Sequence, residues 1–201
     1  MKKNEKTLLT KKRILDAAII EFGTFGYDAA TMNRICEKYK IAKGLVYHNY
    51  KSKEELYCSC VEYAVDSFIE YIGDDFEELN LKKYMEMRYE FFNKNQNLGN
   101  LIFDALLQSH QNLDLHDVKE KFEDFNLNLY KKAIKTLKLR DGITEEDAIE
   151  YYDMVQNMFN RYYLMLNKDK STERKSIIFD HENSLKKILD YMLYGIAEKW
   201  F

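Results

Sequence analysis

The segment from residue 31 to residue 56 concentrates side chains that donate hydrogen bonds or carry positive charge. They are Thr31, Lys43, Tyr47, His48 and Lys53, with Gly44 and Leu45 among them. Ammonium, hydroxyl and imidazole groups donate to oxygen and nitrogen acceptors, and a glycine lets a partner approach the backbone closely. The set suits reversible binding to an acceptor-rich, anionic surface rather than covalent chemistry.

Charge is divided unevenly along the chain of 201 residues. Residues 1–53 hold 12 Lys and Arg against 5 Asp and Glu, whereas residues 54–201 hold 19 against 29, for a formal net charge of -3. A basic N-terminal module therefore precedes an acidic body. This asymmetry favours a polyanionic partner for the module, because an acidic body would repel nucleic acid. On charge alone, a basic face that is only solvated is an equal alternative.

Patterns typical of enzymes and metal sites are weak. His110 and His116 do not share a helical face, and the sequence has no glycine-rich phosphate loop or nucleophile elbow. Cys58 and Cys60 would point to opposite sides of a helix, so they do not predict a metal site. We expect no enzymatic activity, no cofactor and no bound metal.

Composition favours an all-α fold, since the chain has no proline and only 7 glycines. Its three cysteines lack the spacing of a disulfide framework, which indicates a reducing compartment. No uncharged apolar run approaches the roughly 18 residues of a membrane span. We expect a soluble, cytoplasmic protein that has no membrane partner.

Helical periodicity predicts three helices in the basic module, the last two of them short. The first should follow an N-cap at Thr10 and end near Gly23 and Gly26, because glycine breaks helices. The second should follow an N-cap at Thr31, and the third should begin near Ala42. Two short helices joined by a turn of three or four residues form a helix-turn-helix.

A longer helix should open after Ser52, with Glu55 three residues later as in a capping box. This helix marks the transition to the acidic part of the chain. We therefore expect a helix-turn-helix domain in residues 1–53 and a helical body in residues 54–201.

The same stretch resembles the DNA-binding signature of the tetracycline-repressor (TetR) family. The residues that carry the resemblance are TMNRICEKYKIAKGLVYHNYKSKEELY, with FGTFGYDAAT leading into them. They cover about residues 10–57, roughly a quarter of the chain, and the later ILDYMLYGI is similar to the final helix of many members. The resemblance implies a bacterial, homodimeric transcriptional repressor that a ligand releases from DNA.

Three positions depart from the usual signature. Lys40 stands where a turn glycine is usual, so we expect a left-handed residue there. Ala42 replaces a Ser or Thr, which removes a cap worth about 1 kcal/mol from the recognition helix. Asn49 occupies a position often held by His or an aromatic residue.

The third helix would be the recognition helix if Val46 and Tyr50 hold it to the core. Its opposite side then faces the DNA duplex. Lys43 could donate to guanine in the major groove, Gly44 would let the backbone approach closely, and Leu45 could pack on a thymine methyl group.

Other donors of the module are better placed for phosphates than for bases. We expect this role for Tyr47, His48, Lys53 and the hydroxyl of Thr31 at a helix N-terminus. Taken without the signature, Tyr47 and His48 would be ordinary surface residues of a small domain.

Residues 54–201 are expected to form a helical ligand-binding and dimerisation domain. The predicted helices span about residues 53–72, 80–95, 98–109, 114–139, 144–168 and 182–198. The segments YMEMRYEFF and YYDMVQNMFNRYYLML are apolar on more than one side, so each should be buried on more than one side. One side would line a core or pocket, and the other would meet a second subunit.

Candidate ligand-binding residues are Met87, Phe91, Phe103, Met158 and Tyr162. Met and aromatic side chains suit a hydrophobic or aromatic effector, although the same residues fill ordinary cores. The last helix and the one before it would close a four-helix interface in a homodimer.

We therefore expect a repressor that binds a pseudo-palindromic DNA operator and leaves it when a small molecule binds. One alternative is a helical architectural or interaction protein that binds DNA without any ligand. Another is a thiol-responsive repressor that uses Cys36, Cys58 or Cys60.

Overall fold

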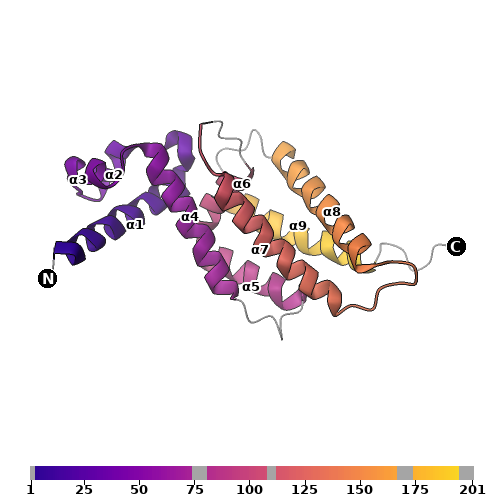
Figure 1. Ribbon diagram of the computed structural model, residues 1–201. Helices are drawn as coiled ribbons and strands as arrows, with labels where there is room; N and C mark the ends of the chain where they lie inside the picture. The colour runs from indigo at the N-terminus through magenta and orange to yellow at the C-terminus, as the bar shows by residue number, and fades with distance from the viewer. Residues whose placement is uncertain (1–2, 74–80, 108–111, 167–173, 195–201) are drawn as a thin grey trace. The chain divides into compact units, whose positions relative to one another are not determined.

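The computed structural model describes residues 3–73, 81–107, 112–166 and 174–194 (Figure 1). Within these ranges all regular secondary structure is helical. The helices are α1 Lys3–Ala29, α2 Met32–Lys38, α3 Lys43–Asn49, α4 Lys53–Ile72, α5 Leu81–Lys94, α6 Gln96–Leu107, α7 His116–Lys135, α8 Glu145–Leu166 and α9 Arg174–Tyr194. The predicted all-α class and the N-terminal helix-turn-helix are confirmed, and no described helix is long and apolar enough to cross a membrane.

Most predicted helices agree with the structure to within a few residues, but two starting points were wrong. The first helix begins at Lys3, so Thr10 lies inside it and is no N-cap. The last helix begins at Arg174, eight residues before the expected start, and the predicted end near residue 198 lies outside the described residues. Both segments contain good helix formers that carry no clear apolar stripe, which periodicity alone overlooks.

The chain divides into two compact units. Unit 1 contains residues 1–68 and 95–120, and unit 2 contains residues 69–94 and 121–201. Unit 1 thus combines α1, α2, α3 and most of α4 with α6. These units do not coincide with the expected DNA-binding domain of residues 1–53 and ligand-binding domain of residues 54–201. That functional division stays a prediction.

The core of unit 1 forms where α1 packs against the helix-turn-helix and α6. Ile14, Phe22 and Ile35 are buried, together with Leu56 and Tyr57 of α4. At Gly23 the helices α1 and α6 approach closely, since a Cβ there would lie 2.7 Å from the Cβ of Asn97. The helix-turn-helix and α6 therefore share one core.

The core of unit 2 forms where α9 packs on α5 and α8. Aromatic rings fill much of it. Tyr130 and Tyr152 stack with ring centroids 3.5 Å apart, and Phe159 and Tyr163 lie against the imidazole of His181. Such rings bury a large apolar area while their polar groups still require partners.

Candidate nucleic-acid interface

The turn between α2 and α3 has the geometry that its sequence predicts. The hydroxyl of Thr31 caps α2 by accepting a hydrogen bond from the backbone N–H of Arg34 at 3.2 Å. Lys40 has φ 51°, which places it in the left-handed region, and Ala42 precedes α3 without a side-chain cap. Ser52 caps α4 through the N–H of Glu55 at 3.2 Å. These local predictions are confirmed.

The recognition helix α3 has one buried side and one exposed side. Val46 and Tyr50 are buried, as expected. Lys43, Gly44, Leu45, Tyr47 and His48 are all exposed. Leu45 is 44% exposed to solvent and Tyr47 is 43% exposed. Two large side chains of this seven-residue helix therefore face solvent.

The exposed side of α3 combines positive charge with an open backbone. The ammonium of Lys43 lies 5.9 Å from the centroid of the Tyr47 ring. A Cβ added at Gly44 would meet nothing within 4 Å, so the packing of this chain does not require a glycine there. The absent side chain leaves room for an external partner at the centre of the helix face.

Lys53 begins α4 and is held at the end of α1. Its Nζ lies 3.4 Å from the carbonyl oxygen of Asp28 and 4.3 Å from the centroid of the Tyr27 ring. The phenol of Tyr27 donates to Glu54 Oε1 at 2.8 Å, and burial, followed by that carboxylate, raises the pKa of Tyr27 to about 12. These neighbours therefore orient Lys53. Thr31 is the other residue outside α3 that we expect to bind phosphate, and it is exposed.

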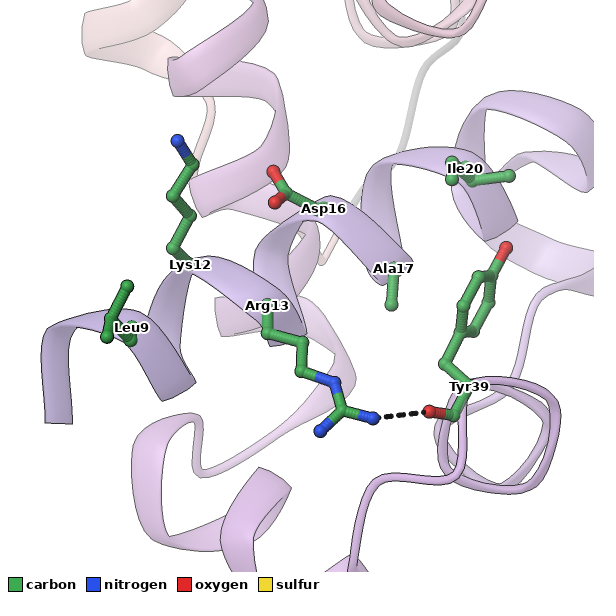
Figure 2. A pocket seen from close by; sticks show the side chains of 7 residues that line it. All are labelled: Leu9, Lys12, Arg13, Asp16, Ala17, Ile20 and Tyr39. Carbon is green, nitrogen blue, oxygen red and sulfur yellow. Dashed lines mark hydrogen bonds between the residues drawn. The ribbon is translucent and has the colours of Figure 1, made fainter. Parts of the chain in front are cut away.

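Three contacts of charged side chains, which the sequence did not predict, hold α2 and the residue after it against α1. Glu21 is fully buried, and its Oε1 lies 2.9 Å from Nε of Arg34, with Nζ of Lys38 3.8 Å from its other oxygen. Arg13 donates to the carbonyl of Tyr39 at 3.0 Å, just after α2 (Figure 2). The signal available in the sequence was an acidic residue on the first helix and two basic residues four positions apart on the second.

A shallow groove of ≈ 490 Å³ lies beside this contact (Figure 2). It is lined by Leu9, Lys12, Arg13, Asp16, Ala17, Ile20 and Tyr39. None of the five predicted ligand-binding residues lines it. Because it mixes charged and aliphatic side chains on the helix-turn-helix domain, we do not assign it to the effector.

The five predicted ligand-binding residues lie in different surroundings. Phe91 of α5 is buried and Met87 is half-buried, both in unit 2, whereas the half-buried Phe103 belongs to α6 in unit 1. Met158 and Tyr162 of α8 keep 64% and 58% of their surface. These two side chains face solvent in the single chain, and the ligand-binding role of the five stays a prediction.

The cysteines have the properties of structural rather than reactive thiols. Burial raises the pKa of Cys36, Cys58 and Cys60, which lowers the fraction of reactive thiolate at neutral pH. Cys36 and Cys60 are buried, and Cys58 lies 3.6 Å from the carbonyl oxygen of Asp114. These features disfavour the thiol-responsive alternative.

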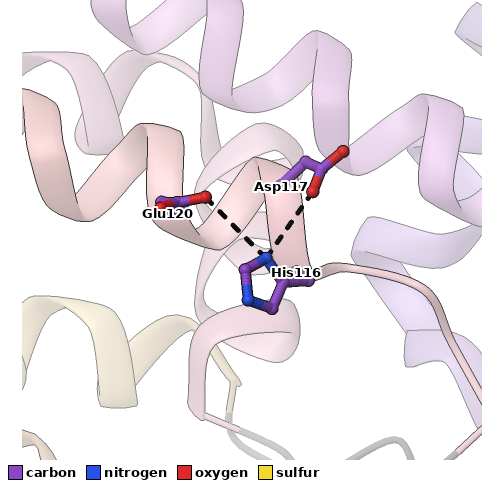
Figure 3. A group of neighbouring side chains, drawn as sticks. All are labelled: His116, Asp117 and Glu120. Atoms are coloured by element: carbon purple, nitrogen blue, oxygen red, sulfur yellow. Dashed lines mark ion pairs between the residues drawn. The ribbon is translucent and has the colours of Figure 1, made fainter.

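Three possible metal ligands meet at the start of α7 (Figure 3). Nδ1 of His116 lies 3.5 Å from an oxygen of Asp117 and 3.8 Å from one of Glu120. All three side chains are exposed and come from one helical turn. An imidazole between two carboxylates on an open surface is a common ion-paired arrangement, so we assign no metal to it.

An exposed recognition helix on a helix-turn-helix core, followed by a helical body, defines a DNA-binding transcriptional regulator. Residues 14–60 match the model of the bacterial regulatory proteins of the tetR family. This match covers the helix-turn-helix part of the chain, from within α1 into α4.

Individual relatives agree with this assignment. The chain is 26% identical over 129 residues to the HTH-type transcriptional regulator YhgD of Bacillus subtilis, covering 57% of this chain and 68% of that protein. It is 24% identical over 182 residues to IcaR of Staphylococcus aureus, the negative transcriptional regulator of the biofilm operon icaADBC, covering 75% and 97%. Both relatives are transcriptional regulators.

The fold is also shared with solved structures. FadR of Bacillus subtilis, crystallised in complex with stearoyl-CoA, aligns with a TM-score of 0.60 at 20% identity, covering 92% of this chain and 99% of that one. At this identity the likeness establishes the helical fold.

Proposed function

We propose that this regulator is a repressor that binds a pseudo-palindromic operator as a homodimer and is released by a hydrophobic or aromatic small molecule. The observation that carries the DNA-binding part is the exposed side of α3, where Lys43 and Leu45 flank Gly44. The negative regulator IcaR supports repression as the mode of control. In this proposal residues 1–53 read DNA, and residues 54–201 bind the effector and the second subunit.

The roles on DNA follow from the positions of the side chains. Lys43 donates to guanine acceptors and Leu45 contacts a thymine methyl group in the major groove. Tyr47, His48, Lys53 and Thr31 bind phosphates and set the register of the protein on the duplex. Because one short helix reads few base pairs, two subunits with half-site centres roughly 34 to 36 Å apart, or a multiple of that, supply the specificity.

An apolar stripe on α8 supports the homodimer. Its members are Tyr151, Met154, Met158, Tyr162 and Met165, with exposed fractions of 48%, 56%, 64%, 58% and 71%. They recur every three or four residues and so share one side of the helix. A contiguous row of large apolar side chains on an acidic unit favours burial against a second copy. Met158 and Tyr162 are exposed in the single chain, so a contact with a second subunit explains their position better than an enclosed ligand pocket does.

The effector would act through the core of unit 2. Phe91 lies there with its ring centroid 5.4 Å from that of Tyr71, at the end of α4. A ligand that enters beside Met87 and Phe91 would shift this end of α4, whose first residue, Lys53, lies at the DNA-reading side. Ligand and DNA would then favour different states and weaken each other reciprocally.

The test begins with selection of duplexes from a random-sequence library by the full-length protein. Light scattering with the enriched duplex should give two subunits per site. Stearoyl-CoA, which is bound in the FadR structure, and compounds from a thermal-shift screen are then titrated against the complex. An effector should raise the stability of the free protein and weaken DNA binding about 5- to 150-fold.

A Met87→Trp variant sharpens the ligand assignment. It should abolish the response to the effector while ligand-free DNA binding persists, and Glu86→Trp, at an exposed position of the same helix, is the control for added bulk. If stabilising ligands never change DNA affinity, the protein is a DNA-binding module without small-molecule input. Failure to enrich any duplex would contradict the proposed function itself.

A further inference from the structure

The helix α1 is broken near its end, and polar side chains of α6 hold the break. Gly26 has φ 77° and ψ 172°, which interrupts the helical backbone. The next N–H, that of Tyr27, donates to Oδ2 of Asp104 at 3.3 Å. One turn earlier on α1, the carbonyl oxygen of Gly23 accepts a hydrogen bond from Asn100 Nδ2 at 2.7 Å. Asn100 and Asp104 thus bind the backbone of α1 on both sides of the break.

Both α6 side chains lie inside unit 1. Asn100 is 8% and Asp104 5% exposed. A buried carboxylate is costly unless it accepts hydrogen bonds, and the phenol of Tyr57 on α4 also donates to Oδ2 of Asp104 at 2.9 Å. One oxygen of Asp104 therefore connects α1, α4 and α6.

Steric contact leaves little freedom around these hydrogen bonds. A Cβ at Gly23 would lie 2.7 Å from both the Cβ and the carbonyl oxygen of Asn97, closer than real Cβ atoms approach. The rings of Tyr27 and Tyr57 pack edge to face with centroids 4.9 Å apart. The contact of α1 with α6 is thus fixed by backbone proximity, hydrogen bonds and ring packing together.

We propose that Asn100 and Asp104 are positioning residues for DNA reading. They touch no DNA themselves, but they fix the break after which the chain turns into α2 and α3, and so fix the placement of the recognition helix on α1. The inference rests on the proposed function, because it names the part of the body on which specific DNA binding depends. In this view α6 belongs to the DNA-reading unit although it is far from the signature in sequence.

The first measurement is the hydrogen exchange of the Tyr27 amide in the full-length protein. Asp104→Ala removes the acceptor of this N–H, so its exchange should accelerate by about tenfold or more. Asp104→Asn keeps one acceptor oxygen and should give a smaller effect. Glu90→Gln is the control, since it alters an exposed carboxylate of unit 2 and should leave Tyr27 exchange at the wild-type rate.

The second measurement is the affinity for the library-selected duplex and for a scrambled duplex of the same length. Asp104→Ala and Asn100→Ala should lose about tenfold on the selected duplex and less than about twofold on the scrambled one. A variant that had merely lost structure would lose both affinities together, whereas Asp104→Asn should partly restore the preference. If Asp104→Ala does not fold, Asn100→Ala and Asp104→Asn carry the test.

The outcomes separate this inference from the proposed function. Faster Tyr27 exchange with an unchanged preference for the selected duplex would overturn the positioning role while leaving the repressor assignment intact. Unchanged exchange in Asp104→Ala would also overturn it. If the wild-type protein enriches no duplex, the proposed function fails first.

Discussion

Arg88 on α5 and Glu182 on α9 form a bidentate ion pair in the core of unit 2. Nε of Arg88 lies 2.8 Å from Oε2 and Nη2 lies 2.6 Å from Oε1, with exposed fractions of 6% for Arg88 and 3% for Glu182. The guanidinium also donates to the phenol of Tyr84 at 3.1 Å and to Asn126 Oδ1 at 3.2 Å. The pair thereby links α5, α7 and α9.

This pair should make stability depend on acid pH. Burial by itself would raise the pKa of Glu182, but the Arg88 guanidinium outweighs it and lowers the pKa to about 2. A carboxyl with a depressed folded-state pKa stabilises the fold above its unfolded value, ordinarily 4.5, and loses that contribution as pH falls toward 2. Glu182→Gln should therefore cost about 3 to 5 kcal/mol at pH 7, because it leaves the Arg88 charge buried without its partner.

Urea unfolding of wild type and Glu182→Gln between pH 7 and pH 2 measures this effect. The difference in unfolding free energy should shrink as Glu182 becomes protonated. Glu90→Gln, at an exposed i,i+4 pair with Lys94, is the matched control and should change stability little. A difference that stays constant down to pH 2 would show that the depressed pKa is wrong.

Replacing Gly44 with alanine should separate stability from DNA binding. The added Cβ meets nothing within 4 Å, and alanine favours a helix over glycine by about 1 kcal/mol, so the variant should be as stable as wild type or more so. If the DNA backbone or bases approach this position, affinity for the selected duplex should fall by about 1 to 3 kcal/mol. Thermal melts and fluorescence anisotropy measure the two effects, and undiminished affinity would remove Gly44 from the interface.

Lys53 and Leu45 should affect DNA binding differently. Lys53→Ala should weaken binding to selected and scrambled duplexes alike and reduce the salt slope by about 1, because one phosphate contact is lost. Leu45→Ala should lose discrimination mainly at one base pair. Lys186→Ala removes an exposed lysine of α9 and is the control for the loss of one positive charge. The titrations run from about 50 to 200 mM salt, because DNA affinity falls steeply over this range. An unchanged slope in Lys53→Ala would contradict its phosphate contact.

The α8 stripe should determine the oligomeric state. Met158→Asp places a charge on a side chain that is 64% exposed in the single chain, so the fold should tolerate it while the apolar contact with a second copy is lost. Light scattering should then report a monomer. Leu8→Asp, at a residue of α1 that is 69% exposed, should leave the dimer intact. A Met158→Asp protein that stays dimeric would place the interface elsewhere.

The sequence by itself determined the all-α class, the positions of α2, α3 and α4, and the exposed side of α3. These features are local, because caps such as Thr31 and Ser52 and the turn at Lys40 act within a few residues, and periodicity assigns helix sides one turn at a time. Only the tertiary structure decided which distant polar groups meet. Arg88 and Glu182 are 94 residues apart, and Tyr27 and Asp104 are 77 apart. Before folding, Arg88, Glu182 and Asp104 each resemble a solvated surface residue, since their burial depends on helices that pack together only in the folded chain.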